Sequence, residues 1–432
     1  MKTYNFKYGH GSVSLSLNEA DILAELHGTE TPPISDIRSA LFASLEQPID
    51  SAPLRQRVRP GDRVALVISD MTRFWMRQDL VIPHLVDYLI DECGVQPEHL
   101  TIVVANGTHI GGDEQELRTL VTDGVYNRVR VKNHDCEAKD LAYLGTTPHE
   151  TPVWIDRTAA EADLVVCLGA ATHHVMAGFG GGRKSILPGI SGLETIRHNH
   201  AYSLDSTKLR TNPAIGNGVL AGNPLHEDMT EVCAKINPAF LVNMVFSPEG
   251  DLHEVVAGHW YKAWEKGCHD LLAMAGVHIK EQADVVIASA GGSPKDINLY
   301  QSCKAHMNAV FAVKPGGYLI LTLDCPDIKE PAIFTDWFSK SDILSFEKEV
   351  RADFSIPAFV AFKTRCIVNS LHTYLVTRPE NFEFVRATGQ IPVASLEEAW
   401  NMVQADLAEK NKKDYTITVM GHASATLPIL DK

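Results

Sequence analysis

The stretch RVALVISDMTR, residues 63–73, joins a continuous apolar run to a polar cluster. The pattern recurs in LTIVVANGTH, residues 100–109, and in DLVVCLGAATHH, residues 163–174. Continuous apolar runs of this length are typical of strands buried on both faces of a parallel sheet. Because parallel strands end at the same edge of a sheet, the polar clusters are expected to meet in one crevice. The side chains expected there are Asp70, Arg73, His109 and His174.

A second alternation of strand and helix patterns begins after Gly276. It opens with the apolar run ADVVIASA, residues 283–290, and continues with a helical pattern over 301–313, which KPGG at 314–317 is expected to end. At 432 residues and 45% hydrophobic, the chain exceeds the usual size of a single core. The sequence therefore predicts an α/β fold of two domains, each with a mainly parallel, Rossmann-like sheet flanked by helices.

A glycine-rich loop with a lysine follows the third strand pattern and reads GFGGGRKS over 178–185. Glycines let backbone N–H groups approach an anion, and the lysine adds a positive charge, so the loop is a candidate phosphate site. It is not a Walker A motif, because Arg183 replaces its second glycine and Pro188 falls where its helix would continue. The structural alternative is a flexible glycine turn with Lys184 exposed to solvent.

Histidines flank this loop on both sides. A single histidine among the 19 is usually a hydrogen-bonded core residue, but the position of these next to strand ends favours a function. One alternative is a zinc hydrolase that uses His173, His174, His198 and His200. Against it, the sequence has no HExxH motif and few carboxylates in the clusters to act as a base. A non-catalytic nucleotide-binding module is the other alternative, which leaves the strand-end residues without a role.

The motifs resemble those of the nickel-dependent lactate racemase family. They stand in the family's order as DMTR (70–73), GTH (107–109), the run from His174 to Lys184, His200, and QSCK (301–304). The run from His174 to Lys184 is the most specific of these. Gly180 departs from it, since the family has a serine at that position.

The resemblance implies a cofactor, the nickel-pincer nucleotide, which is pyridinium-3,5-bisthiocarboxylic acid mononucleotide with nickel. It implies that Lys184 holds this group covalently and that His200 is the protein's ligand to the metal. Imidazole is a suitable ligand for nickel. The residues expected to cradle the phosphate are Gly178, Gly181, Gly182 and Arg183. Enzymes that synthesise the cofactor are then partners of the chain.

For catalysis, the resemblance implies an isomerase that racemises or epimerises C2 of a 2-hydroxy acid. Hydride leaves C2 for the cofactor and returns on the opposite face of the substrate. His109 and His174 are expected to act as base and acid, one for each enantiomer. Arg73 is expected to contact the substrate oxygen, with Asp70 orienting its guanidinium.

The resemblance also implies a role for each domain. Residues 1–276 form the cofactor-binding and catalytic domain, to which residues 415–432 are expected to return. Residues 282–412 form the substrate-binding domain, in which Gln301 and Lys304, one helical turn apart, hold the substrate carboxylate. The active site is expected in the cleft between the domains.

Charge and composition argue against other partners. A net charge of −15 and a pI near 5.7 argue against binding to nucleic acid or to an anionic membrane. The chain has no signal peptide and no apolar run of the ~18 residues that cross a membrane. Its eight cysteines include no CxxC pair, which predicts reduced thiols and a cytoplasmic protein.

The tail of the substrate stays open among lactate, aromatic hydroxy acids, malate-like diacids and sugar acids. The residues that follow DMTR allow two interpretations. In one, Phe74 and Trp75 pack in the core while Arg77 points to water. In the other, Trp75 or Arg77 lines the substrate pocket, where the planar fork of an arginine would bind a distal carboxylate.

Overall fold

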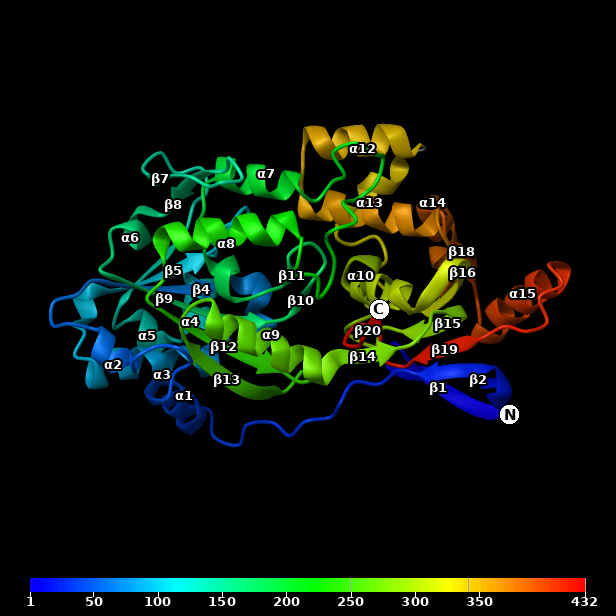
Figure 1. Ribbon diagram of the computed structural model, residues 1–432, viewed down its shortest axis with the longest axis horizontal. Helices are drawn as coiled ribbons and strands as arrows, with labels where there is room; N and C mark the ends of the chain where they lie inside the picture. Colours follow the sequence, from blue (N-terminus) through cyan, green and yellow to red (C-terminus); the bar gives the residue numbers. More distant parts are fainter. Residues whose placement is uncertain (249, 341, 432) are drawn as a thin grey trace. The chain divides into compact units, whose positions relative to one another are not determined.

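The computed structural model describes residues 1–248, 250–340 and 342–431 (Figure 1). Contacts within the chain group these residues into two compact units. The first, called the lysine unit because it contains Lys184, consists of Glu30–Tyr202 and Ala214–Ala273. The second, called the terminal unit, consists of Met1–Thr29, Ser203–Pro213 and the chain from Met274 onward.

The units differ from the predicted domains of 1–276 and 282–412. Residues 1–29 and 203–213 belong to the terminal unit. Residues 415–432 were expected to return to the first domain, but their strand β19 (Ile417–Met420) lies in the terminal unit between β15 (Ala283–Ser289) and β3 (Ile22–Glu25). A buried apolar strand needs a hydrogen-bonded neighbour on each side, and the sequence pattern does not say which sheet supplies it.

The lysine unit is built on a six-stranded sheet in the order β13-β12-β9-β4-β5-β6. All neighbouring strands are parallel except β13, which runs antiparallel to β12. The three predicted strands are confirmed as adjacent members of this sheet. The strands are β4 (Val64–Ser69), β5 (Leu100–Ala105), β6 (Arg130–Asn133), β9 (Leu164–Ala171), β12 (Phe240–Phe246) and β13 (Leu252–Gly258).

Helices cover both faces of this sheet. On one face, α1 (Ile37–Glu46), α3 (Ile82–Asp87) and α4 (Glu114–Val121) share a core with alternate strand residues. On the other face, Gly267 of α9 (Lys262–Ala275) lies against Val245 of β12. The remaining elements are α2 (Leu54–Arg57), η2 (Met71–Met76), η3 (Gln78–Leu80), η4 (Tyr88–Glu92), η5 (Pro97–His99), α5 (Asp123–Tyr126), β7 (Ala142–Thr146), β8 (Pro152–Ile155), α6 (Arg157–Ala160), β10 (His173–His174), β11 (Gly178–Phe179), η6 (Gly182–Ser185), α7 (Leu193–Ala201) and α8 (Pro224–Ile236).

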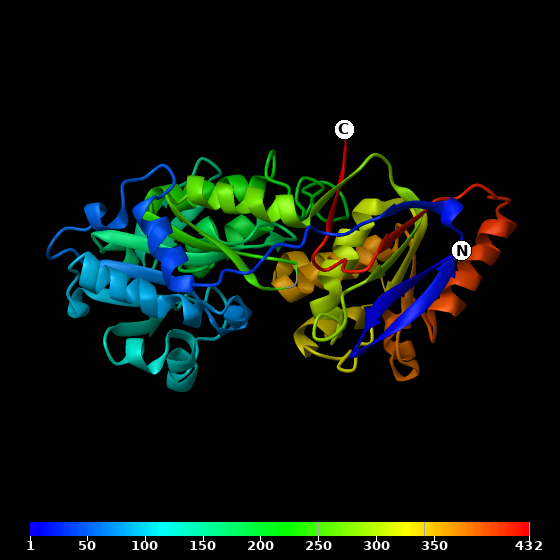
Figure 2. The ribbon, with the colours of Figure 1, turned by 90° about the horizontal axis from the view of Figure 1, so that it is seen from below.

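The terminal unit has its own six-stranded sheet, β18-β17-β16-β15-β19-β3, in which all neighbours are parallel. Its other strands are β16 (Val313–Thr322), β17 (His372–Val376) and β18 (Ile391–Val393). One face carries the hairpin of β1 (Lys2–Tyr8) and β2 (Gly11–Leu17) together with α15 (Leu396–Glu409), which Figure 2 shows in blue and orange-red. A short parallel pair joins β14 (Gly276–Ile279) to β20 (Leu427–Leu430).

The helix predicted over 301–313 is α10 (Leu299–Ala309), extended by the turn η7 (Val310–Ala312). The helix ends before KPGG at 314–317, as predicted, and KPGG lies within β16, where the register with β15 is irregular. The remaining elements of this unit are η1 (Glu19–Asp21), α11 (Ala332–Thr335), η8 (Asp336–Ser339), α12 (Ile343–Ala352), α13 (Ile356–Val368), η9 (Pro379–Asn381) and α14 (Phe382–Thr388).

Asp284 of β15 links three strands of the terminal sheet. Its carboxylate accepts hydrogen bonds from Lys314 at 3.1 Å, from Lys412, and from the backbone and hydroxyl of Thr416, each at 3.0 Å. Burial raises the pKa of Asp284, but these donors outweigh burial and lower the pKa to about 2. The ionised carboxylate therefore stabilises the folded state above the pKa of the unfolded carboxyl, ~3.9, and this stability is lost as the pH falls toward about 2.

Asp284→Asn is therefore expected to lower the free energy of unfolding by about 2 kcal/mol at pH 7. The loss should be much smaller near pH 2, where about half of the wild-type carboxylate is itself protonated. Urea unfolding at both pH values measures the two differences. An equal loss at both pH values would contradict the ionic origin of this stability.

Candidate active site

The strand-end clusters lie at the carboxyl ends of three adjacent strands, β9, β4 and β5. Asp70 follows β4 directly and begins the turn η2, while His109 lies in the loop after β5. His174 lies in β10, which pairs with β11 beyond the end of β9. The parallel arrangement therefore brings all three side chains to one edge of the sheet, as the strand pattern predicted.

Asp70 and His109 form a hydrogen-bonded pair. Oδ2 of Asp70 lies 2.7 Å from Nδ1 of His109, and the hydroxyl of Thr72 donates to Oδ1 of the same carboxylate at 2.8 Å. Burial raises the pKa of Asp70, but the hydrogen bonds from His109 and Thr72 outweigh it and hold this pKa below its ordinary value. An ionised Asp70 fixes Nδ1 of His109 as the protonated nitrogen, so Nε2 carries the lone pair.

Arg73 has no direct ion pair with Asp70 among the described residues, although its charge contributes to lowering the pKa of Asp70. Nη1 of Arg73 donates instead to Oγ1 of Thr72 at 3.0 Å. Thr72 therefore connects the guanidinium to the carboxylate, because its own hydroxyl proton goes to Asp70. The carboxylate of Asp70 is already engaged by His109 and Thr72. Thr72 was missed, although its place inside the DMTR motif was the available signal.

The glycine loop packs closely against its own protein. The φ angles of Gly178, Gly181 and Gly182 are +77°, +68° and +53°. A Cβ on Gly181 would lie 2.5 Å from the carbonyl oxygen of Ala170, and one on Gly182 would lie 2.5 Å from the ring of Trp264. Backbone conformation and contact with β9 and α9 therefore require glycine here, whether or not a phosphate binds.

The loop is not a P-loop, as the sequence predicted. After it the chain makes only the short turn η6, and the next helix, α7, begins at Leu193.

Arg183 does not reach out of the loop, as a phosphate ligand would. Its side chain is fully buried beneath the loop, and Nη2 donates to the carbonyl of Ala177 at 2.6 Å. Burial lowers the pKa of the Arg183 guanidinium to about 10. In the described part of the chain, no carboxylate lies within ion-pair distance of it. The predicted direct contact with phosphate is therefore replaced by contacts to the backbone of the loop.

Lys184 and His174 lie side by side. The Nζ atom of Lys184 is 3.1 Å from Nε2 of His174, whose Nδ1 accepts the backbone N–H groups of Met176 and Ala177. Because Nδ1 is an acceptor, Nε2 must carry the proton and donate it to an amine with a lone pair. Burial, followed by the charges of Arg73 and Arg183, lowers the pKa of Lys184 to about 7. This contact therefore contains the neutral, nucleophilic form of the lysine.

His200 lies in the last turn of α7 and is buried. Its Nδ1–H donates to the carbonyl of Ile196 at 2.9 Å, so Nε2 carries the lone pair. Burial, followed by the charge of Lys184, lowers the pKa of His200 to about 4 and keeps the imidazole neutral. A neutral ring with one nitrogen held by a backbone carbonyl is the usual form of a metal-ligating histidine. His198, two residues earlier, is exposed.

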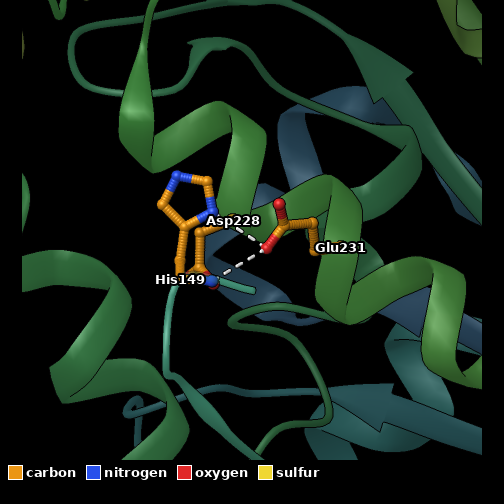
Figure 3. A group of neighbouring side chains, drawn as sticks. All are labelled: His149, Asp228 and Glu231. Carbon is orange, nitrogen blue, oxygen red and sulfur yellow. Dashed lines mark hydrogen bonds and ion pairs between the residues drawn. The ribbon is translucent and has the colours of Figure 1, made fainter. Parts of the chain in front are cut away.

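The histidines of the zinc alternative do not form a metal site within residues 1–248, 250–340 and 342–431. The group there with metal-ligand spacing is His149, Asp228 and Glu231 (Figure 3). It is explained by hydrogen bonds: Nδ1 of His149 lies 2.9 Å from Glu231, and Asp228 is fully buried. The donors to Asp228 are Thr147 at 2.8 Å, Thr151 at 3.0 Å and Asn199 at 2.9 Å. These bonds tie the loop between β7 and β8 to α8 and α7.

Four further residues were candidates for binding the substrate: Gln301, Lys304, Arg77 and Trp75. Gln301 and Lys304 lie on the exposed face of α10 in the terminal unit, one helical turn apart. Arg77 makes two hydrogen bonds to Asp79, at 3.0 and 2.9 Å, which occupy its planar fork. Trp75 is 48% exposed, so it is not a core residue. Their roles toward a substrate stay predictions.

Comparison with known proteins gives consistent results. Models of the lactate racemase N-terminal and C-terminal domains match residues 8–212 and 278–425. A lactate racemase from Thermoanaerobacterium thermosaccharolyticum is 31% identical over 376 residues, or 85% of this chain and 86% of that protein. A lactate racemase from Lactiplantibacillus plantarum is 31% identical over 287 residues, or 66% of this chain and 65% of that protein.

Two solved structures share the fold. The lactate racemase apoprotein of Thermoanaerobacterium thermosaccharolyticum superposes with a TM-score of 0.86 and 26% identity, covering 99% of this chain and all of that one. A protein from Thermotoga maritima gives a TM-score of 0.59 at 17% identity, over 91% of this chain and 97% of that one, and shows the fold alone.

The fold and the site define an α/β enzyme in which a lysine of lowered pKa lies next to a histidine beyond the ends of parallel strands. The chain belongs to the lactate racemase family, whose members are isomerases. Among the described residues, no helix is long and apolar enough to cross a bilayer.

Proposed function

We propose that this chain racemises or epimerises a 2-hydroxy acid at C2, with a nickel-pincer nucleotide held covalently by Lys184. The observation that carries the proposal is the position of Nζ of Lys184, 3.1 Å from Nε2 of His174, together with a pKa of Lys184 lowered to about 7. Covalent attachment would need the neutral form of the amine, and a solvent-exposed lysine at neutral pH would be almost entirely protonated. A lysine with a purely structural role does not need this environment.

The residues present fit the cofactor in two respects. His200 offers a neutral imidazole whose tautomer is set by Ile196, which suits a nickel ligand. Arg73 and Arg183 place two positive charges near Lys184, and both lower its pKa. Positive charge gathered there favours an anionic ligand such as a nucleotide phosphate. The glycine loop does not add to this argument, since its close packing already accounts for its glycines.

When bound, the cofactor supplies an acceptor and donor for the C2 hydride. The hydride route suits this substrate, because the C2 hydrogen next to a carboxylate is a poor acid. In the proposal, His109 takes the proton of the substrate hydroxyl through Nε2. Asp70 then stabilises the resulting imidazolium through Nδ1–H, 2.7 Å from its carboxylate. Arg73 stabilises negative charge on the substrate oxygen.

His174 is proposed as the second acid and base, and its starting state differs from that of His109. Without the tether, its Nε2–H is directed at the lone pair of Lys184. With Lys184 holding the cofactor, Nζ would no longer accept this hydrogen bond, and Nε2 of His174 would be available to the substrate. To accept a proton, His174 must also release the N–H groups of Met176 and Ala177 from Nδ1. Apo geometry does not disqualify an acid–base group for this reason.

The substrate carboxylate is assigned to Gln301 and Lys304, whose exposed amide and ammonium groups can donate to it together. We place the protein in the cytoplasm, where the enzymes that synthesise the cofactor are its partners. Lactate is the reference substrate, and longer, aromatic, diacid and sugar-acid substrates stay open.

The test is to co-express the chain with the enzymes that make the cofactor and to assay single-enantiomer hydroxy acids for loss of optical purity. Nickel content and intact mass are measured on the same preparation. We expect nickel, an adduct of several hundred daltons and racemisation of at least one acid. Bound zinc without an adduct would refute the proposal and favour the hydrolase. Protein expressed without the synthesis enzymes is the control and is expected to be inactive and unmodified.

A further inference from the structure

Three side chains hold the glycine loop: Arg183, which belongs to the predicted site, and Trp264 and His226, which do not. The guanidinium of Arg183 lies 4.0 Å from the centre of the Trp264 ring. Its Nε donates to Nδ1 of His226 at 2.9 Å, and the His226 ring stacks on Trp264 with centres 5.5 Å apart. Arg183, Trp264 and His226, from the loop, α9 and α8, are called the loop clamp. All three are buried.

The loop clamp binds the backbone of the loop through carbonyl oxygens. Arg183 donates to the carbonyl of Ala177 at 2.6 Å and to that of Phe179 at 3.3 Å. The indole N–H of Trp264 donates to the carbonyl of Gly180 at 2.9 Å. The carbonyls on the two sides of Gly178 and the one before Gly181 are thereby fixed, in a segment whose glycines would otherwise be the most mobile residues.

The same bonds decide where the loop N–H groups point. A peptide unit is planar and trans, so its N–H points away from its C=O. The carbonyl of Gly180 is drawn toward α9 by Trp264, and the N–H of Gly181 therefore points to the opposite side of the loop. Lys184 is attached to this arrangement by its own N–H, which bonds the carbonyl of Gly181 at 3.1 Å. The orientation of the lysine thus depends on the loop clamp.

Arg183 has no anionic partner among the described residues. A role in stability alone would therefore not explain why a charged side chain is buried here. Burying an unpaired guanidinium costs several kcal/mol, which an apolar side chain of similar size would avoid. His226 is held neutral as the acceptor, since burial and the charge of Arg183 lower its pKa to about 3. Among the described residues, the loop carbonyls, the lone pair of His226 and the face of the Trp264 indole compensate the charge.

We propose that Arg183 and Trp264 are positioning residues that set the glycine loop so that the amine of Lys184 faces the cofactor. This inference rests on the proposed function in one respect, the attachment of the cofactor to Lys184. It assigns to Arg183 a different task from the phosphate contact that the motif implied, and it adds Trp264, which lies on α9 far along the chain.

Two variants separate positioning from general stability. Trp264→Phe keeps an aromatic face for Arg183 and removes the N–H that binds Gly180. Arg183→Lys keeps a charge and removes the fork that binds two carbonyls at once. The matched control is Trp260→Phe, which also removes one indole hydrogen bond, to Asn237 at 3.0 Å, but away from the loop.

Two readouts are taken for each variant. The first is the rate at which an acylating reagent labels Lys184 in cofactor-free protein at one pH, followed by peptide mass spectrometry. The second is the fraction of Lys184 that carries the adduct after co-expression with the synthesis enzymes. We expect both clamp variants to change labelling and to lower the adduct fraction by roughly tenfold or more. Their unfolding midpoints should stay close to that of Trp260→Phe.

Wild-type labelling and wild-type adduct in both clamp variants would overturn the inference, as would the same loss in Trp260→Phe. If Arg183→Lys does not fold, Trp264→Phe decides alone. Absence of any adduct on wild-type protein would refute the proposed function instead. The labelling measurement would then still test the loop clamp, because it uses protein without cofactor.

Discussion

Lys184→Ala is expected to abolish the covalent mass adduct and all racemisation together. Alanine has no amine to bond the cofactor, and the hydride chemistry proposed here belongs to the cofactor. The folded protein should survive, because removing a desolvated amine creates no unpaired charge. Intact mass, nickel content and the racemisation assay measure the effect on protein co-expressed with the synthesis enzymes.

Lys304→Ala is the matched control for this experiment. It also removes a lysine of the proposed site, but one assigned to the substrate carboxylate. It should therefore keep the adduct and nickel and raise KM. Activity with bound nickel in Lys184→Ala would contradict the proposed tether, whereas loss of the adduct in Lys304→Ala would show that adduct formation does not report on Lys184 specifically.

His109→Ala and His174→Ala are each expected to slow racemisation by ~10²- to 10⁴-fold while nickel and the adduct are retained. Each variant removes the group that moves the hydroxyl proton for one enantiomer, and net racemisation requires both. The rates are measured from each pure enantiomer. His109 is held by Asp70, so its loss should leave Lys184 unaffected, whereas loss of His174 also removes the neighbour of the amine.

His198→Ala provides the control, because this exposed histidine lies on the same helix as His200 and has no proposed role. It should retain wild-type rates in both directions. Full activity in either His109→Ala or His174→Ala would refute the two-base scheme.

Strand positions were predictable because apolar runs this short, each followed by a polar cluster, are typical of buried strands rather than of buried helices. The predicted strands 63–69, 100–105 and 163–169 match β4, β5 and β9 to within two residues at each end. The assignment of strands to sheets was not predictable, since β19 and β3 are separated by most of the chain and pair by hydrogen bonds that any apolar strand can make. KPGG was predicted to end the helix, and the helix does end before it, but the start of β16 at Val313 and the irregular register of this strand across KPGG were not predicted.

The sequence motifs identified the residues of the candidate site, but they did not predict which side chains these residues contact. Asp70, His109, His174, Lys184 and His200 all lie in the lysine unit, as predicted for the first domain. The partner predicted for Asp70 was wrong, because a one-dimensional motif cannot say which of two basic side chains the carboxylate faces. Arg183 was misjudged for a related reason: a charge beside a lysine suggests an anion, whereas its direction depends on Trp264, a residue on a distant helix.

Because β3 and β19 belong to one sheet, the two units can fold only in a fixed order while the chain is being synthesised. The lysine unit ends at Ala273, so every segment it needs has been synthesised before the last third of the chain begins to emerge. The terminal unit must wait, because β3, among the first strands to leave the ribosome, has β19 as its partner in the sheet. Pairing over so long a stretch of chain is slow. A nascent chain can therefore contain a folded lysine unit while β3 is still an unpaired strand, open to aggregation and to chaperones.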